Sequence, residues 1–252
     1  MGFLNKLGIG TGHAPRQGAR SLPESRTGHN NSHRGGAAAA AGPHKEPELE
    51  TSTRVSNALK DFLWNLDGLG RGTLLDLGPA WQTTLSFFIE RGFRVTSEDL
   101  LRGWTDFQAK EAQQSKGMVL TADDYAERTP EALAKKFLDD NLQYSPSSFD
   151  ALLLWDILDY LEPTLGKMMV SHVTEMLRPG GVVLALFHSK KPTGFQRYRV
   201  VDTTTLQVLS AKPIVPAQKV FQNREIQALF SGFRSMKSYI GRDQLREALF
   251  LK

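Results

Sequence analysis

The sequence contains no cysteine. This absence excludes disulfide bonds, thiolate nucleophiles and cysteine-ligated metal centres, so we expect a core held by packing alone and no metal site. The sequence also lacks any run of about 18 apolar residues, the length that a helix needs to cross a bilayer. Its first six residues do not contain the apolar stretch of a signal peptide. We therefore expect a cytoplasmic protein with no membrane partner.

A strong excess of charge is also missing from the part of the chain that can fold. The net charge is +4, but seven of the 31 Lys and Arg and four of the 27 Asp and Glu lie in residues 1–54. The remainder holds 24 basic and 23 acidic residues, a net charge of +1. This balance provides no electrostatic footprint for a polyanion, so we expect no nucleic-acid partner.

Large apolar residues are almost absent before residue 50 and common after it. A segment rich in Gly, Ala, Pro, Ser and His cannot bury enough apolar surface to offset the loss of chain entropy on folding. We predict a disordered N-terminal tail at 1–52 and one folded domain at 53–252. The length of the domain suits a single hydrophobic core.

Short apolar runs alternate with helical patterns through this domain. The runs at 73–77, 93–96, 149–155 and 182–187 predict parallel strands, and a third strand is expected near Phe137-Leu138, after a short helix at 130–136. Apolar residues at helical spacing, from Val55 to Leu66, from Trp81 to Ile89 and from Leu165 to Met176, predict helices between strands. The alternation indicates an α/β fold of the Rossmann-like, doubly wound type with a mostly parallel sheet.

The last third of the chain departs from this alternation. Residues 198–201 and 206–209 flank a turn like a hairpin, which predicts an insertion at 190–220 that could serve as a substrate lid. Tyr160 and Tyr198 are candidates to close over a substrate, although both could equally pack against loops. Residues 233–240 and 245–251 predict an antiparallel strand pair at the edge of the sheet.

The loop after the first predicted strand is the place to look for a ligand. In open α/β sheets, ligands bind beyond the carboxyl ends of the strands. This loop contains Asp76 and Gly78, and Asp99 ends the second strand 23 residues after Asp76. Glycine lets the backbone approach a ligand closely, and an acid at the position of Asp99 is typical of a contact to ribose hydroxyls.

Four segments, in this order, resemble the landmarks of class I S-adenosylmethionine-dependent methyltransferases. They are residues 74–78, residues 92–96 leading to Asp99, residues 149–153 and residues 177–181. The resemblance covers 73–188 and implies a seven-stranded sheet, S-adenosylmethionine as cofactor, and methyl transfer to a small molecule or a protein side chain. It places Asp76 and Gly78 near the methionine moiety, Asp99 on the ribose, Asp140 or Asn141 beside adenine, and Asp156 in the methyl-transfer pocket. Ala80, in the same loop as Gly78, is a further candidate cofactor contact.

The glycine loop departs from the pattern of that family. Ala80 and Gln82 occupy the second and third glycine positions, and Pro79 stiffens the turn. Methyl transfer from a sulfonium depends mainly on positioning, so no obligatory catalytic motif is expected. A general base helps when the acceptor must lose a proton, and the candidates for catalytic roles are His188 and Asp156, with Asp159 nearby.

Two other functions remain open from the sequence. The altered loop also suits a catalytically inactive module that keeps the fold for binding, and the topology also suits an NAD(P)-dependent oxidoreductase. The sequence does not specify the oligomeric state or the methyl acceptor.

Overall fold

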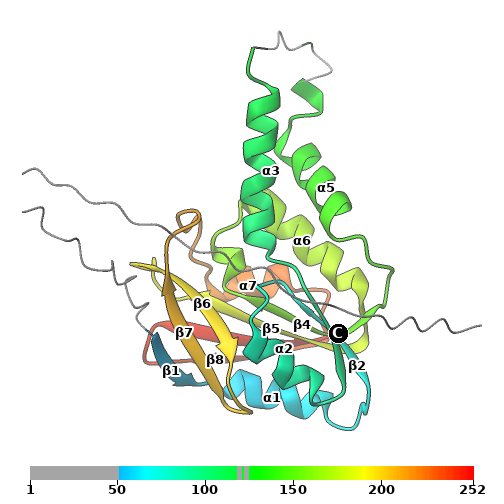
Figure 1. The fold of residues 1–252 in the computed structure, drawn as a ribbon, viewed down its shortest axis with the longest axis vertical. Coiled ribbons are helices and arrows are strands. Elements are labelled where there is room, and N and C mark those ends of the chain that lie inside the picture. Colours follow the sequence, from blue (N-terminus) through cyan, green and yellow to red (C-terminus); the bar gives the residue numbers. More distant parts are fainter. Residues whose placement is uncertain (1–50, 118–120, 122–124) are drawn as a thin grey trace, which may run out of the picture. The chain divides into compact units, whose positions relative to one another are not determined.

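The computed structural model describes residues 51–117, 121 and 125–252 (Figure 1). The predicted tail at 1–52 lies outside these residues, except for Thr51 and Ser52. Within the described residues the chain is a mixed α/β protein with a sheet between two layers of helices, as the sequence predicts.

The main sheet has six strands in the order β3-β2-β4-β5-β9-β8. The first four run parallel, whereas β9 pairs antiparallel with both β5 and β8. The strands are β2 (Gly72–Asp76), β3 (Phe93–Ser97), β4 (Phe149–Trp155), β5 (Leu177–His188), β8 (Ser235–Ile240) and β9 (Leu245–Leu251). The expected seventh strand is absent from the described residues.

That missing strand was predicted near Phe137-Leu138, and this prediction was wrong. Both residues lie inside helix α5 (Pro130–Asn141), which begins after the Thr129 cap and does not stop at residue 136. Ala134, Phe137 and Leu138 are buried on one face of this helix, and the Phe137 ring contacts Trp104. Helical spacing of three and four residues, set by a strong N-cap, therefore prevails over a local pair of apolar residues.

Alternate residues of the strands belong to two separate cores. On one face, side chains such as Leu75, Leu152 and Val183 pack with helices α3 (Leu100–Gln114), α5, α6 (Pro163–Met176) and α7 (Asn223–Leu229). On the other face, Leu74, Leu153 and others pack with α1 (Asn57–Leu66) and α2 (Gln82–Ile89). Helices on both faces confirm the doubly wound arrangement, because a period of two sends neighbouring side chains to opposite sides.

A second, three-stranded antiparallel sheet has the order β1-β7-β6. The predicted hairpin forms its strands β6 (Phe195–Val200) and β7 (Thr205–Ala211), and β1 (Thr51–Val55) pairs with β7. The sequence analysis placed Val55 on a helix, but Val55 ends β1 and is exposed. The helix begins only after Ser56, whose hydroxyl accepts a hydrogen bond of 3.0 Å from the Leu59 N–H.

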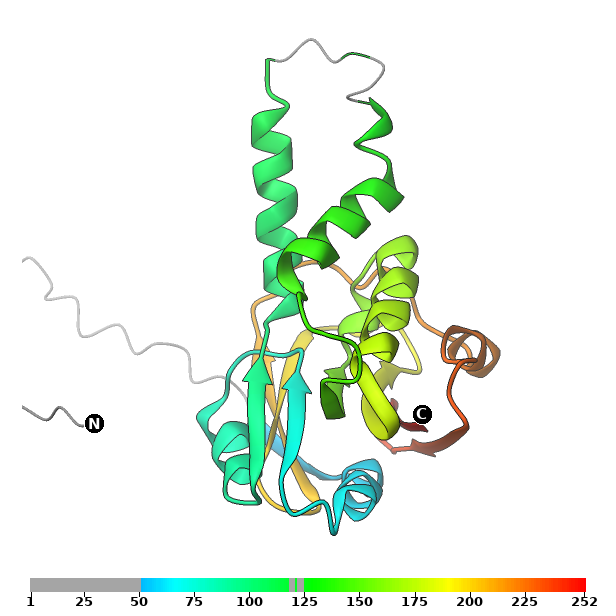
Figure 2. The ribbon, with the colours of Figure 1, turned by 90° about the vertical axis from the view of Figure 1, so that its right-hand side faces the viewer.

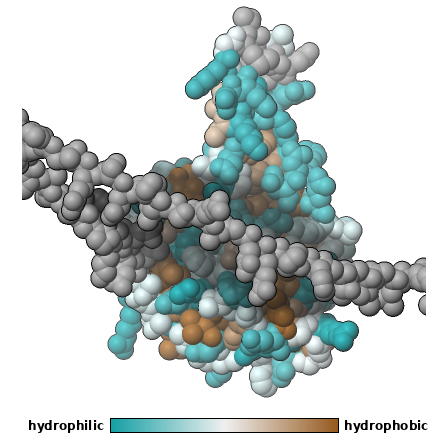
Figure 3. All heavy atoms as spheres, in the orientation of Figure 1, coloured by the Kyte–Doolittle hydropathy of each residue, from teal (hydrophilic) through white to brown (hydrophobic). Residues whose placement is uncertain are grey.

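Helices α3 and α5 extend beyond the sheet side by side (Figures 1 and 2). Near the sheet they share the aromatic contacts of Trp104, Phe107 and Phe137. Hydrophilic side chains cover their outer parts (Figure 3). The helix α3 has no counterpart in the sequence analysis.

A short 3-10 turn (η1, Ile157–Asp159) joins β4 to α6. Within the described parts of the chain, none of the helices is both long and apolar enough to cross a membrane.

Candidate functional site

The carboxyl ends of β2 and β4 meet at one point of the sheet. β3 and β4 lie on opposite sides of β2, so the chain winds in both directions from this strand. Such a switch point is the usual ligand position in open α/β sheets. Asp76 ends β2, and Trp155 ends the neighbouring β4.

Asp76 is fully buried at this point. Its Oδ1 atom accepts hydrogen bonds from the Gly78 N–H at 2.9 Å and from the Trp155 indole N–H at 2.7 Å. Its Oδ2 atom is buried and has no hydrogen-bond partner among the described residues. Burial raises the pKa of Asp76 to about 6, although both hydrogen bonds act in the opposite direction.

Trp155 lies against Gly78 in a strained backbone conformation. Its φ angle is 51°, in the left-handed region that bulky residues rarely adopt. A Cβ atom built on Gly78 would lie only 2.7 Å from two atoms of the indole ring. The ring therefore occupies the space in front of Gly78, which a bare glycine backbone could otherwise offer to a ligand.

Tyr198 of β6 packs against this indole. The two rings are stacked with centroids 5.9 Å apart and an angle of 12° between their planes. Both side chains are buried. The Tyr198 hydroxyl donates a hydrogen bond of 3.1 Å to Asp156 Oδ2. A continuous set of contacts thus leads from Asp76 through Trp155 and Tyr198 to Asp156.

Asp156 belongs to a second polar group, together with Asp159 and His188. Asp159 Oδ2 lies 3.0 Å from His188 Nδ1 and accepts a hydrogen bond of 2.7 Å from the His188 backbone N–H. Asp156 Oδ2 is 3.8 Å from the same ring nitrogen. The sequence analysis placed these three residues at one edge of the sheet, and the structure brings them into one cluster.

Burial governs the protonation of this cluster. It raises the pKa of Asp156 to about 7 and raises the pKa of Asp159. Burial lowers the pKa of His188, but the Asp159 hydrogen bond and the two nearby carboxylates outweigh it, so the pKa of His188 is raised. The raised pKa of Asp156 brings one group of the cluster into the range that acid–base chemistry uses.

Asp99 has two protein partners. It caps α3 by accepting a hydrogen bond of 3.4 Å from the Arg102 N–H, and both of its oxygens lie 3.3 Å from the Arg197 guanidinium of β6. Its neighbour Glu98 accepts a 2.6 Å hydrogen bond from the Tyr144 hydroxyl. A ribose at Asp99 would compete with Arg197.

The other predicted cofactor contacts are exposed. Ala80 is exposed in the loop before α2. Asp140 and Asn141 were expected after a strand, but they are the last two residues of α5, where Asp140 is exposed and the Asn141 amide donates to the Phe137 carbonyl. Asp140 and Asn141 were expected beside adenine because they would follow the third strand, and this reason does not hold for either residue.

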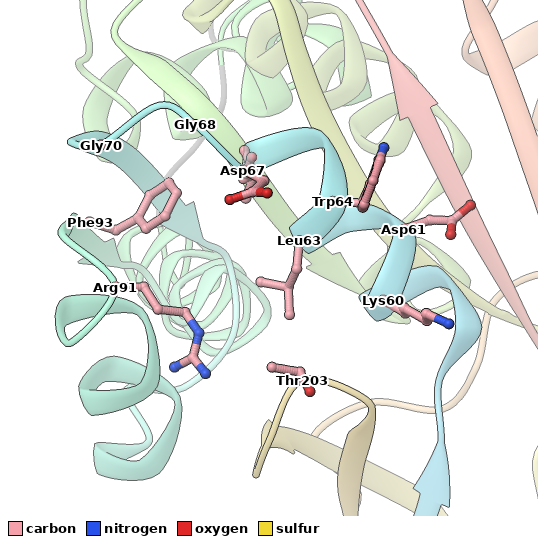
Figure 4. A pocket seen from close by; sticks show the side chains of 11 residues that line it. Lys60, Asp61, Leu63, Trp64, Asp67, Gly68, Gly70, Arg91, Phe93 and Thr203 are labelled. Atoms are coloured by element: carbon pink, nitrogen blue, oxygen red, sulfur yellow. The ribbon is translucent and has the colours of Figure 1, made fainter.

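Two cavities are relevant to ligand binding. One of about 420 Å³ is lined by His188, with Arg54, Lys190, Lys191 and Gln196 among its other residues. Another of about 600 Å³ lies between α1 and the start of β3, with Leu63, Arg91 and Phe93 around it (Figure 4). The second cavity is at the amino ends of the strands and includes none of the predicted site residues.

Sequence reasoning missed the residues that close the corner. Trp155 was interpreted only as the end of a strand, and Arg197 was not considered. Their positions depend on pairing between distant segments, so no local pattern could have identified them. Among the described residues, no three His, Cys, Asp or Glu side chains are grouped closely enough to hold a metal ion.

No protein-family profile matches the chain, and no curated protein is significantly similar to it in sequence. The similar solved structures include a 1,6-didemethyltoxoflavin-N1-methyltransferase from Burkholderia thailandensis with bound 1,6-didemethyltoxoflavin and S-adenosylhomocysteine. It is 16% identical, with 78% of each chain covered and a TM-score of 0.40. An S-adenosylmethionine-dependent methyltransferase from Mesorhizobium loti is 14% identical, with 78% of this chain and 99% of that chain covered and a TM-score of 0.41. A third, from Methanosarcina mazei, is 15% identical, with 73% and 93% covered and a TM-score of 0.38. These similarities concern the fold alone.

Proposed function

We propose that this chain is an S-adenosylmethionine-dependent methyltransferase whose cofactor corner is closed in the conformation described here. The observation that carries the proposal is the Oδ2 atom of Asp76, which is buried at the switch point of the sheet without a hydrogen-bond partner among residues 51–117, 121 and 125–252. A buried carboxylate oxygen without a hydrogen bond is costly and is retained mainly where a ligand or water completes it.

The residues at this corner fit the cofactor on one side and exclude it on the other. Asp76 and Gly78 would hold the methionine moiety, and Asp99 would meet the ribose after release of Arg197. We assign no adenine contact to Asp140 or Asn141. The Trp155 indole fills the space in front of Gly78, so binding requires this ring to move. S-adenosylmethionine, when bound, supplies a methyl group on an already activated sulfonium.

His188 is suited to take a proton from a methyl acceptor. Asp159 engages Nδ1, so the ring is held in one orientation and Nε2 is the nitrogen that remains for the acceptor. His188 also lines the cavity of about 420 Å³, which is large enough for a small molecule. Asp156, linked to Tyr198, lies between this base and the cofactor corner.

Titration calorimetry with S-adenosylhomocysteine tests the proposal. We expect measurable binding, and we expect Asp99→Ala to weaken it by about 1–3 kcal/mol, the range for losing hydrogen bonds to a charged group. Asp106→Ala is a matched control, because Asp106 is an exposed acid on the same helix with no contact to the corner. Binding of NAD but not of S-adenosylhomocysteine would instead support an oxidoreductase.

A second candidate function is a binding module that does not transfer methyl groups. The packing of β6 favours it: Tyr198 and Val200 are buried in the same core as Leu74 and Phe88, and the Val200 N–H donates to the Thr84 hydroxyl at 3.0 Å. A strand packed in this way resembles a permanent wall more than a lid. Absence of adenosyl-ligand binding in the wild type and in Trp155→Phe would favour this function over the first.

A further inference from the structure

The cavity beside His188 is lined by several cationic side chains. It lies at the carboxyl end of β5, and its walls come from β1, from the 188–196 segment and from the turn between β8 and β9. Its volume is about 420 Å³, and its lining includes Arg54, His188, Lys190, Lys191 and Gln196. Most of the charged groups on this wall are cationic.

The charges in the wall are not balanced. Arg54 is neutralised by Asp243 and Glu247, each 2.7 Å from a guanidinium nitrogen. Asp243 is the one acid among the described lining residues. Lys190 and Lys191 are exposed and form no ion pair within the described part of the chain. The two lysines thus leave a net positive charge at the mouth of the cavity.

Hydrogen-bond donors accompany this charge. The Gln196 carbonyl oxygen lies 3.2 Å from the Tyr198 hydroxyl, and the Gln196 amide nitrogen has no hydrogen-bond partner among the described residues. The Nδ1 atom of the His188 ring lies against Asp159, and its Nε2 atom makes no hydrogen bond within the described residues. Ammonium groups and an amide N–H are donors that bind carboxylates and phosphates, and the Nε2 atom of His188 can accept a hydrogen bond from another polar group of the same molecule.

We infer that this cavity binds a small anionic molecule, with its carboxylate or phosphate group on Lys190 and Lys191 and another polar group at His188. The inference rests on the proposed function only where it makes this molecule the methyl acceptor. The anion site itself stands on the shape and charge of the cavity.

The test is an NMR titration of the full chain with inorganic phosphate and, separately, with citrate, against chloride at equal ionic strength. The C2–H resonance of His188 is assigned from its loss in His188→Gln. We expect a saturable shift of this resonance with at least one probe and none with chloride. The double variant Lys190→Ala/Lys191→Ala should weaken the apparent affinity about tenfold or more, because both exposed ammonium groups are removed.

The control is Lys110→Ala/Lys116→Ala, which removes two exposed lysines at and just beyond the end of α3. It should leave the titration unchanged. Equal weakening in both double variants, or no saturable shift with either probe, would overturn the anion site. Calorimetry with S-adenosylhomocysteine on the same sample separates the two proposals: its failure with the anion titration intact would remove only the methyl-acceptor role.

Discussion

The Trp155 indole N–H donates a hydrogen bond of 2.7 Å to Asp76 Oδ1 and so ties together the last residues of two neighbouring parallel strands. In an open α/β sheet these strand ends usually face a ligand. Here one carboxylate oxygen accepts hydrogen bonds from the protein itself, and the other has no partner in the described part of the chain. If this hydrogen bond can break and the indole can move, the corner can serve as a cofactor site. If it is permanent, the corner is part of the core.

Trp155→Phe tests that contact directly. Phenylalanine keeps an aromatic ring against Tyr198, but it removes the indole N–H and part of the ring that lies against Gly78. We expect S-adenosylhomocysteine to bind about tenfold tighter or more, since a larger fraction of molecules would have an open corner. Titration calorimetry on the variant and the wild type measures this ratio.

Trp64→Phe provides the control, because the Trp64 side chain is exposed on α1 and lines the cavity at the amino ends of the strands. It should leave the affinity unchanged. The variant Trp155→Phe should also be less stable by about 1–3 kcal/mol, as a buried hydrogen bond to a carboxylate is lost. Lower stability without any gain in affinity would mean that the indole is a structural element and not a gate.

The buried acids predict an unusual dependence of stability on pH. The pKa of Asp76 is about 6 and that of Asp156 about 7, both raised by burial, whereas an unfolded Asp titrates near 3.9. The folded state therefore retains protons that the unfolded state has lost. The stability that these two groups contribute is fully present below the unfolded pKa near 3.9. It is lost as pH rises through the folded values of about 6 and about 7. The raised pKa of His188 acts in the same direction.

We expect the free energy of unfolding to be larger at pH 5 than at pH 8. The slope is about 1.4 kcal/mol per pH unit for each retained proton. Urea unfolding at several pH values measures it. Asp156→Asn replaces the protonated acid with a neutral amide. It should reduce the slope of the unfolding free energy against pH by up to the contribution of one retained proton. Greater stability at pH 8, or an unchanged slope in the variant, would contradict this account.

Much of the fold could be predicted because its signals are local. The apolar run that forms β4 and the Thr129 cap of α5 each depend on neighbours in the sequence. The third strand was predicted wrongly because Phe137 and Leu138 fit a short strand as well as a helix face. The strand β1 was missed because it is stabilised by β7, some 150 residues away.

The candidate site divides in the same way. Asp76, Gly78, Asp156 and His188 were predicted because each ends a strand or follows one, and parallel strands end at a common edge. The partners of these residues could not be predicted. Arg197 reaches Asp99, and Tyr198 reaches Asp156, from a hairpin whose position over the sheet has no signature in the sequence.

We expect a large loss of stability when Glu247 is replaced by alanine. Its buried carboxylate accepts hydrogen bonds from Arg54 at 2.7 Å, from the Ser56 hydroxyl at 3.0 Å and from the Ala58 N–H at 2.8 Å. Glu247→Ala leaves these donors unsatisfied and should cost about 3–5 kcal/mol, as for other broken buried ion pairs. Urea unfolding measures the loss. Glu175→Ala, at an exposed position on α6, should change stability little, and equal losses would argue against the assigned role.

Asp159→Asn tests the acid–base pair on which the proposed proton transfer depends. Burial lowers the pKa of His188, and the Asp159 carboxylate is the main group that raises it again, followed by the charges of Asp156, Asp159 and Asp243. The asparagine carbonyl can still accept one hydrogen bond but carries no charge. We therefore expect the pKa of His188 to be lower in Asp159→Asn than in the wild type. The C2–H resonance of His188 followed across pH measures this change.

His172 is the internal control, since its ring contacts the Leu142 carbonyl and not the cluster. A fall in both histidines would indicate a general structural change, and no fall in His188 would show that Asp159 does not set its protonation.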